Sequence, residues 1–325
     1  MRKKRNIINR RDFLRASAAG AGAFYLSGQS SAESVSISKE KLLPKRVLGK
    51  TGRMLSIIGL GGMVVAGLEQ AKADAIVERS VEKGVNYFDV SPEYGDAEFR
   101  LGPALKPFRE DVFLACKTSR RDKEGAEKEL HRSLERLQTK HFDLYQLHNL
   151  EDIEEDAKKA LSKNGAIQTF IKAREQGLVK YLGFSAHSDE AALLAMREFD
   201  FDTILYPINF CCHYKGKFSQ EVLSEAKKRG MGILAIKSMA KQVWQNEEDE
   251  EKHPKCWYEP IEDPFLAEDA LRWTLSQGVT AAVPPGDENL YKLALQIGPH
   301  IREITEQEEE KLKQIAGGLE PLFRA

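Results

Sequence analysis

Short apolar runs, rich in β-branched and aromatic residues, alternate with amphipathic segments along most of the chain. The runs predict eight strands, at residues 55–60, 85–89, 112–116, 143–147, 181–184, 203–206, 233–236 and 280–283. Apolar residues spaced three or four apart predict helices between them, at residues 72–83, 96–105, 124–138, 164–176, 189–198, 218–229 and 265–277. A late acidic helix, around residues 306–315, is expected on the outside of the fold. This α/β alternation is typical of a closed (β/α)8 TIM barrel.

The main alternative is an open, doubly wound parallel sheet, which binds a dinucleotide at its first glycine-rich turn. That turn requires the pattern G-x-G-x-x-G, but residues 59–64 read GLGGMV, with Val64 at the last position. We therefore favour the barrel.

Two segments depart from a minimal barrel. Residues 45–53 predict one arm and the turn of an N-terminal β-hairpin, and residues 241–262 form a long polar loop after the seventh strand. Because loops at that end of the strands line the active face of a TIM barrel, the loop could bring Trp244, Trp257 and Tyr258 to a substrate. We favour the alternative, a solvated loop with its own aromatic cluster.

The first 32 residues have the order of parts found in an export signal. A basic head containing Arg10 and Arg11 precedes an apolar run at 16–26 and small residues at 30–32. This order is typical of a secretory signal, and the paired arginines resemble the twin-arginine signal. The alternative is a basic tail followed by an Ala/Gly linker.

Three segments are therefore predicted: a twin-arginine signal peptide at 1–32, a linker at 33–44 and the barrel at 45–325. The resemblance implies that the twin-arginine export machinery is a partner and that the protein is periplasmic. Cleavage is expected after Ala32.

Composition argues against several classes of protein. The chain carries 49 basic and 50 acidic residues, but seven basic and one acidic residue lie in the first 32, which leaves an acidic body. Proteins that bind nucleic acids present positive surfaces, so no nucleic-acid partner is expected. Four cysteines without a C-x-x-C pattern indicate neither a disulfide framework nor a zinc site, and no metal is expected. The chain has no run of 18 apolar residues, so stable insertion into a membrane is not expected.

Four polar residues of complementary chemistry lie at or just beyond the ends of three successive predicted strands. They are Asp89, Tyr94, Lys117 and His148. Reactive residues of a TIM barrel lie at these strand ends. An ammonium beside Tyr94 would lower the pKa of the phenol from about 10, and Asp89 would keep Lys117 protonated. With His148 orienting a carbonyl oxygen, the group suits protonation of that oxygen while a nicotinamide cofactor delivers hydride to the carbon.

Several motifs resemble the aldo-keto reductase family over residues 45–300. The matching stretches are residues 48–52 (LGKTG), 59–63 (GLGGM), 84–95 (GVNYFDVSPEYG), 116–118 (CKT), 143–148 (DLYQLH) and 177–185 (GLVKYLGFS). The resemblance implies reversible NADP(H)-dependent reduction of an aldehyde or ketone to an alcohol. It assigns the catalytic tetrad to Asp89, Tyr94, Lys117 and His148, with Tyr94 as general acid and base.

The resemblance also implies cofactor contacts, which match the family less well. They fall on Gly62, Met63, Ser185, Ile236, Lys237, Gly286 and Lys292. Ala186 and Leu205 replace the Asn and Gln that commonly help Ser185 hold the nicotinamide carboxamide. Asp287 and Glu288 replace the residues that usually bind the 2′-phosphate, so use of NAD(H) is also compatible with the sequence.

Two other functions remain open from the sequence. An exported protein lies outside the cytoplasmic nicotinamide pool, so the barrel could be a catalytically silent protein that binds a nicotinamide or another ligand. A Schiff-base aldolase could use Lys117 as its nucleophile, but it would leave Tyr94 and His148 without a joint task. The substrate depends on the loops at 149–163, 211–217 and 241–262.

Overall fold

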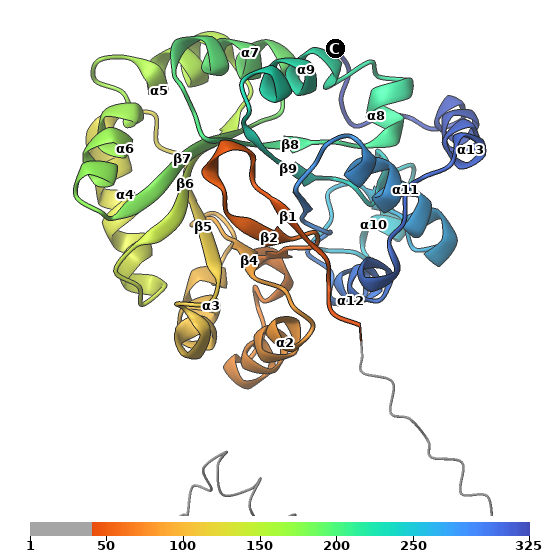
Figure 1. Cartoon of the computed structure of the whole chain (residues 1–325), viewed down its shortest axis with the longest axis horizontal. Helices are drawn as coiled ribbons and strands as arrows, with labels where there is room; N and C mark the ends of the chain where they lie inside the picture. The colour runs from red at the N-terminus through yellow and green to blue at the C-terminus, as the bar shows by residue number, and fades with distance from the viewer. Residues whose placement is uncertain (1–40) are drawn as a thin grey trace, which may run out of the picture. The chain divides into compact units, whose positions relative to one another are not determined.

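The computed structural model describes residues 41–325, so the predicted signal peptide and most of the predicted linker lie outside the described residues. Eight parallel strands follow one another around a barrel (Figure 1). They are β3 (Leu60–Gly61), β4 (Tyr87–Asp89), β5 (Phe113–Thr118), β6 (Phe142–Leu150), β7 (Val179–Ala186), β8 (Thr203–Pro207), β9 (Gly232–Ile236) and β12 (Ala281–Ala282). A parallel bridge between Ile58 and Ala282 joins the first strand to the last. The predicted (β/α)8 barrel is confirmed.

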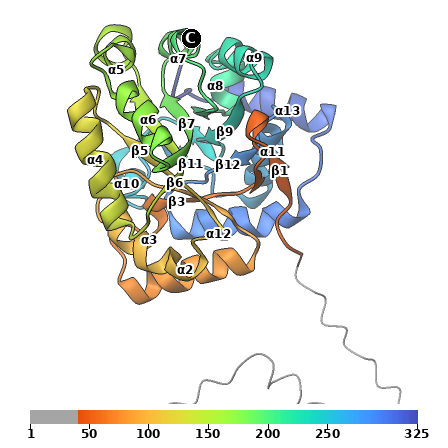
Figure 2. The same cartoon turned by 60° about the vertical axis from the view of Figure 1, so that its left-hand side comes forward.

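Each strand is followed by a helix that covers the outside of the barrel (Figure 2). These helices are α2 (Gln70–Glu82), α3 (Ala97–Leu105), α4 (Lys123–Arg136), α6 (Ala166–Glu175), α7 (Asp189–Glu198), α9 (Gln220–Lys228), α11 (Pro264–Ser276) and α12 (Glu288–Ile297). The sequence analysis missed α12, although Leu290, Ala294 and Ile297 form a buried stripe at helical spacing.

Shorter elements fill the connections. They are the 3₁₀ helices η1 (Gly49–Thr51), η2 (Gly62–Val64), η3 (Lys106–Phe108) and η5 (Gly298–His300), the π-helix η4 (Ile153–Lys158), and the helices α5 (Lys159–Leu161), α8 (Phe210–Tyr214) and α10 (Glu247–Glu250). The late acidic helix α13 (Glu306–Gly317) starts with a capping box formed by Thr305 and Glu308, and it packs against α8 and α11. It lies on the outside, as predicted.

The N-terminal hairpin closes the bottom of the barrel. Its strands β1 (Lys45–Val47) and β2 (Met54–Ser56) pair antiparallel and lie across the middle of the ring in Figure 1. Leu55 is fully buried among the side chains that fill the barrel interior. The predicted strand at 55–60 is therefore two elements, a hairpin arm and β3. The Ser56 hydroxyl donates a hydrogen bond of 2.8 Å to the Ile58 carbonyl, which turns the chain between them.

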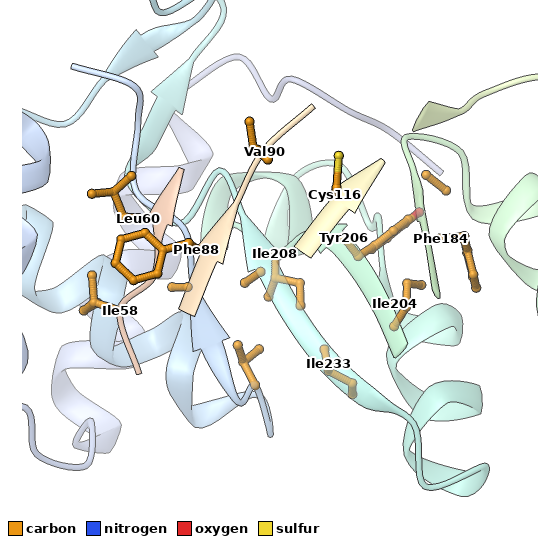
Figure 3. Packing of buried hydrophobic residues seen from close by; sticks show 14 of the residues in the cluster. Ile58, Leu60, Phe88, Val90, Cys116, Phe184, Ile204, Tyr206, Ile208 and Ile233 are labelled. Carbon is orange, nitrogen blue, oxygen red and sulfur yellow. The ribbon is translucent and has the colours of Figure 1, made fainter. Parts of the chain in front are cut away.

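Successive side chains along each strand point alternately toward the helices and into the barrel. In β4, Tyr87 and Asp89 point into the barrel, while Phe88 points outward into the apolar layer beneath the helices (Figure 3). In β5, Cys116 points into that layer, as the same figure shows, and Lys117 points inward. Because side-chain direction repeats every two residues, the polar side chains at the strand ends point into the mouth of the barrel.

The long loop after β9 carries a short antiparallel pair, β10 (Ala240–Gln242) with β11 (Glu259–Pro260). The expectation that this loop stays out of the core is only partly right. Cys256, Tyr258 and Ile261 are buried. Within residues 41–325, no helix has the length and apolar character needed to cross a membrane.

Candidate active site

A cavity of about 250 Å³ opens at the C-terminal ends of the barrel strands. All four predicted catalytic residues line it: Asp89, Tyr94, Lys117 and His148. They come from β4, the turn after β4, β5 and β6. The barrel thus brings together residues that lie up to 59 positions apart in the sequence.

A buried ion pair lies at the floor of this cavity. The Lys117 ammonium donates a hydrogen bond to the Asp89 carboxylate and another of 3.3 Å to the Val90 carbonyl. Tyr87 and Gln146 also donate to Asp89, at 3.3 and 3.1 Å. Burial opposes the charge on Lys117, but the Asp89 carboxylate and the Tyr94 oxygen outweigh it, so the pKa of Lys117 is raised. The amine therefore stays protonated.

Tyr94 lies directly above this ion pair. Its hydroxyl is 3.5 Å from Lys117 Nζ, and the ammonium is 5.0 Å from the centre of its ring. Burial raises the pKa of Tyr94, and this effect outweighs the lowering by Lys117. The expectation of a lowered phenol pKa is therefore wrong in sign. The phenol stays protonated at neutral pH, which is the form that a proton donor requires.

His148 forms the wall next to Tyr94, with the two rings edge to face and their centres 5.8 Å apart. Its Nδ1 atom lies 3.1 Å from Ser91 Oγ and 3.1 Å from Glu93 Oε2. Burial lowers the pKa of His148 despite the nearby carboxylate of Glu93. The imidazole is therefore neutral at pH 7 and can hydrogen-bond a substrate without adding a charge.

Five of the seven predicted cofactor residues line the cavity: Met63, Ser185, Ile236, Lys237 and Gly286. The other two do not. Gly62 lies behind the wall, where a Cβ would come 2.8 Å from the Val90 side chain. Lys292 is exposed on α12, in a separate groove between α12 and α2. The predicted cofactor contacts of these two residues stay predictions.

Two aromatic residues of the long loop reach this cavity and contact Lys237. Its ammonium lies 4.6 Å from the ring centre of Trp257 and 4.5 Å from that of Tyr258. Burial lowers the pKa of Lys237 to about 8. Trp244 lies apart, bonded to the Cys256 carbonyl. The favoured interpretation of a solvated aromatic cluster is therefore only partly right: Trp257 is 52% exposed and packs edge to face on Tyr258, but both residues line the cavity.

The charges at one rim bear on which dinucleotide fits. Gly286 approaches Met63 so closely that a Cβ would lie 2.5 Å from the Met63 Cβ, so no side chain fits at this part of the cavity lining. Lys255 also lines the cavity, with its Nζ 3.2 Å from the Val64 carbonyl. The Asp287 carboxylate caps α12 by accepting two backbone N–H bonds, and Glu288 pairs with a lysine of α2 at 2.6 Å. Lys237 and Lys255 therefore offer two positive charges to a pyrophosphate, whereas the Asp287 carboxylate already occupies the N-terminus of α12.

Several site residues escaped the sequence analysis. Tyr87 and Gln146 precede Asp89 and His148 by two residues, so strand periodicity could have placed them on the same face. His187 differs from these residues, because its place near a strand end predicts a structural or substrate-lining role; it lines the cavity, and burial lowers its pKa to about 3. Nothing in the local sequence indicated a role for Glu93, because its contact, His148, lies 55 residues away in the sequence. Within residues 41–325, no group of side chains has the arrangement of a metal site.

Comparisons with known proteins agree with this geometry. Residues 57–316 match the model of the "Aldo/keto reductase family". The uncharacterized oxidoreductase YqkF of Bacillus subtilis is 32% identical over 44% of this chain, and the match spans about half, 48%, of YqkF itself. L-galactose dehydrogenase of Arabidopsis thaliana is 28% identical over 64% of this chain and 69% of its own length.

Solved structures show the same fold. The aldo-keto reductase AKR11C1 from Bacillus halodurans superposes with a TM-score of 0.67 at 23% identity, covering 84% of this chain and 96% of that one. The family match spans most of the described residues and includes all four residues of the tetrad. The chain belongs to the aldo/keto reductase family.

Proposed function

We propose that this protein is an NAD(P)H-dependent oxidoreductase that interconverts an aldehyde or ketone and the corresponding alcohol. The observation that carries the proposal is the Tyr94 hydroxyl, held 3.5 Å from a charged Lys117 in a cavity that His148 also lines. The dehydrogenase names of relatives, such as L-galactose dehydrogenase and the pyridoxal 4-dehydrogenase of Microbacterium luteolum, support it.

Each residue of the tetrad has a separate task in this proposal. Bound reduced nicotinamide would supply hydride to the carbonyl carbon. Tyr94 gives its proton to the carbonyl oxygen, and the Lys117 ammonium stabilises the phenolate that remains. Asp89 keeps Lys117 charged and in place, and His148 positions the substrate oxygen beside the Tyr94 hydroxyl. Lys117 is a protonated ion-pair partner of Asp89 in this proposal, whereas a Schiff-base nucleophile must be a neutral amine.

The proposed cofactor sits between the tetrad and the rim lined by Gly286. Ser185 and Ile236 would hold the nicotinamide end, and Lys237, Lys255 and Gly286 the pyrophosphate. The family resemblance implies NADP(H). The carboxylates at the start of α12 would repel a 2′-phosphate and favour NAD(H). Titration of protein fluorescence with NADH and with NADPH separates the two, and binding of neither would contradict the enzyme proposal.

The Tyr94→Phe variant tests the chemistry. We expect kcat/KM for carbonyl reduction to fall by about 10²- to 10⁴-fold, the contribution of a general acid, while the affinity for cofactor stays unchanged. A panel of aldehydes, ketones and sugars with both cofactors provides the assay. Tyr181→Phe removes a hydroxyl that binds the Thr51 carbonyl at 3.2 Å, away from the cavity lining; it is the matched control and should keep its activity. A Tyr94→Phe variant as active as the parent would remove the assigned proton donor.

We also propose that the protein is exported to the periplasm through the twin-arginine pathway. The support is the order of charges, apolar residues and small residues in 1–32, which lie outside the described part of the chain. In a bacterial host with that pathway, N-terminal sequencing of the secreted protein should begin at Glu33. Replacing Arg10 and Arg11 by Lys should keep the protein in the cytoplasm. A periplasmic form that retains Arg10 would contradict the cleavage prediction.

A further inference from the structure

Glu93 contacts the cavity histidine, although the proposed chemistry assigns it no task. It lies in the turn between β4 and Tyr94, and its Oε2 atom is 3.1 Å from His148 Nδ1. The backbone amide of Glu93 donates to Ser91 Oγ at 3.3 Å, and the same hydroxyl is 3.1 Å from His148 Nδ1. Two side chains of one turn, Ser91 and Glu93, thus converge on one nitrogen of the imidazole.

The ionisation of Glu93 decides which nitrogen of His148 carries the hydrogen. Contact with His148 lowers the pKa of Glu93 to about 2, so the side chain is a carboxylate at neutral pH. A carboxylate only accepts hydrogen bonds. Nδ1 must therefore be the protonated nitrogen of the neutral ring, and Nε2 carries a lone pair.

The surroundings of His148 leave Nε2 for a ligand. An Arg121 side chain binds the His148 backbone carbonyl at 2.8 Å rather than the ring. The other charged or titratable groups near the ring are Asp89, Tyr94, Lys117 and His187. Among the described residues none hydrogen-bonds Nε2, and His148 lines the cavity. Nε2 is thus the ring nitrogen available to a substrate oxygen.

We propose that Glu93 is a positioning residue that holds His148 in the Nδ1–H form. At Nε2 the neutral ring can only accept a hydrogen bond, and the protonated ring donates one to the carbonyl oxygen that receives the Tyr94 proton. This inference rests on the proposed oxidoreductase function. It means that Glu93 sets the pH range over which His148 hydrogen-bonds the carbonyl substrate.

The first test is nuclear magnetic resonance of the full chain labelled with 15N-histidine, without substrate. The His148 signals are assigned by their loss in His148→Gln. At pH 7.5 we expect a protonated Nδ1 and a bare Nε2. In Glu93→Gln, which removes the charge, the pKa of His148 should fall by roughly 0.5–1 unit. This change in the His148 pKa is smaller than the loss of a fully buried charge would cause, because the Glu93 side chain is 54% exposed and solvent screens its charge.

A matched control exists directly after β6, the strand that carries His148. Glu151 Oε1 lies 3.3 Å from His187 Nδ1, and its side chain is similarly exposed, at 58%. Glu151→Gln should leave the His148 signals unchanged. A wild-type His148 in the Nε2–H form, or a Glu93→Gln variant with an unchanged His148 pKa, would overturn the inference.

The second test is kinetic. In Glu93→Gln, kcat/KM for carbonyl reduction should fall roughly three- to tenfold, mainly through KM, and its basic limb should move to lower pH together with the His148 pKa. A structural role alone would lower the activity without moving that limb.

Different results would contradict the two proposals. Loss of the expected nuclear magnetic resonance pattern overturns the role of Glu93, whereas a Tyr94→Phe variant with full activity overturns the enzymatic chemistry.

Discussion

The buried pair of Asp89 and Lys117 shows how a charged group is kept inside the barrel. Lys117 is fully buried, and removing an isolated ammonium from water costs several kcal/mol. The Asp89 carboxylate offsets this cost, and Tyr87 and Gln146 satisfy its remaining lone pairs. The pair is thus held by a network rather than by one contact, and it keeps the ammonium beneath the Tyr94 hydroxyl.

Breaking this pair on one side should destabilise the fold. In Lys117→Met the Asp89 carboxylate remains buried without its cation, and we expect a loss of about 3–5 kcal/mol in the free energy of unfolding. The double variant Asp89→Asn/Lys117→Met buries no charge and should recover much of that loss. Urea unfolding followed by circular dichroism measures both. Purely additive effects of the two substitutions would contradict the coupling.

At the level of single residues, the tetrad could be predicted because its members lie at strand ends that the apolar pattern marks. The sign of the Tyr94 pKa shift could not be predicted. It depends on the balance between burial and the Lys117 charge, and burial is a property of the folded chain. The same holds for Glu93, whose role depends on a partner from β6.

Among the elements, the hairpin β1–β2 acts as the bottom of the barrel. Leu48 and Leu55 pack with Tyr87, Phe113 and Leu144 in the barrel interior. The exposed residues of the hairpin face away from this cluster. Val47, for example, is 53% exposed. One side of the hairpin therefore contributes to the core, and the other side does not.

Truncation on the two sides of this hairpin should have different effects. Leu55→Ala leaves a cavity in the barrel interior and should cost about 2–5 kcal/mol in the free energy of unfolding. Val47→Ala lies in the same hairpin but removes exposed surface, so its effect should stay within about 0.5 kcal/mol. Thermal and urea unfolding of the two variants give the comparison. Equal losses would mean that the hairpin does not close the core.

The boundaries of the elements were predicted unevenly. Helices with a polar face, such as α4, matched closely, because one side faces solvent and the periodicity is clear. The hairpin arm and β3 merged into one predicted strand at 55–60, because both are apolar and three residues separate them. Helix α12 was not predicted, although Leu290, Ala294 and Ile297 form a buried stripe at helical spacing.

For the molecule as a whole, burial of histidines links stability to pH. Burial lowers the pKa of His141, His148, His187 and His213 below that of a free imidazole. When pH falls below about 6.5, the unfolded chain takes up protons that the folded chain does not. The unfolded state is then favoured, so stability is largest above pH 6.5 and decreases as the pH falls.

His187 should account for a measurable part of this effect. Its pKa of about 3 in the folded protein implies a loss of up to about 2 kcal/mol between pH 7.5 and pH 5. Urea unfolding at both pH values should show this loss for the wild type. In His187→Gln the decrease should be smaller by a similar amount. An equal pH dependence in both proteins would show that His187 does not titrate in this way.

Local pattern was enough to predict the barrel, its order of strands and helices, and four residues that meet at its mouth. The reason is that strand and helix periods are set by the backbone, and parallel strands align their C-terminal ends wherever such a barrel forms. Contacts between distant segments settled the rest. The loop at 241–262 brings Trp257 and Tyr258 onto Lys237, and the turn after β4 brings Glu93 onto His148. Such pairs depend on the path of each loop in the folded protein and on which side chains that path buries. The spacing of residues along the sequence determines neither of these.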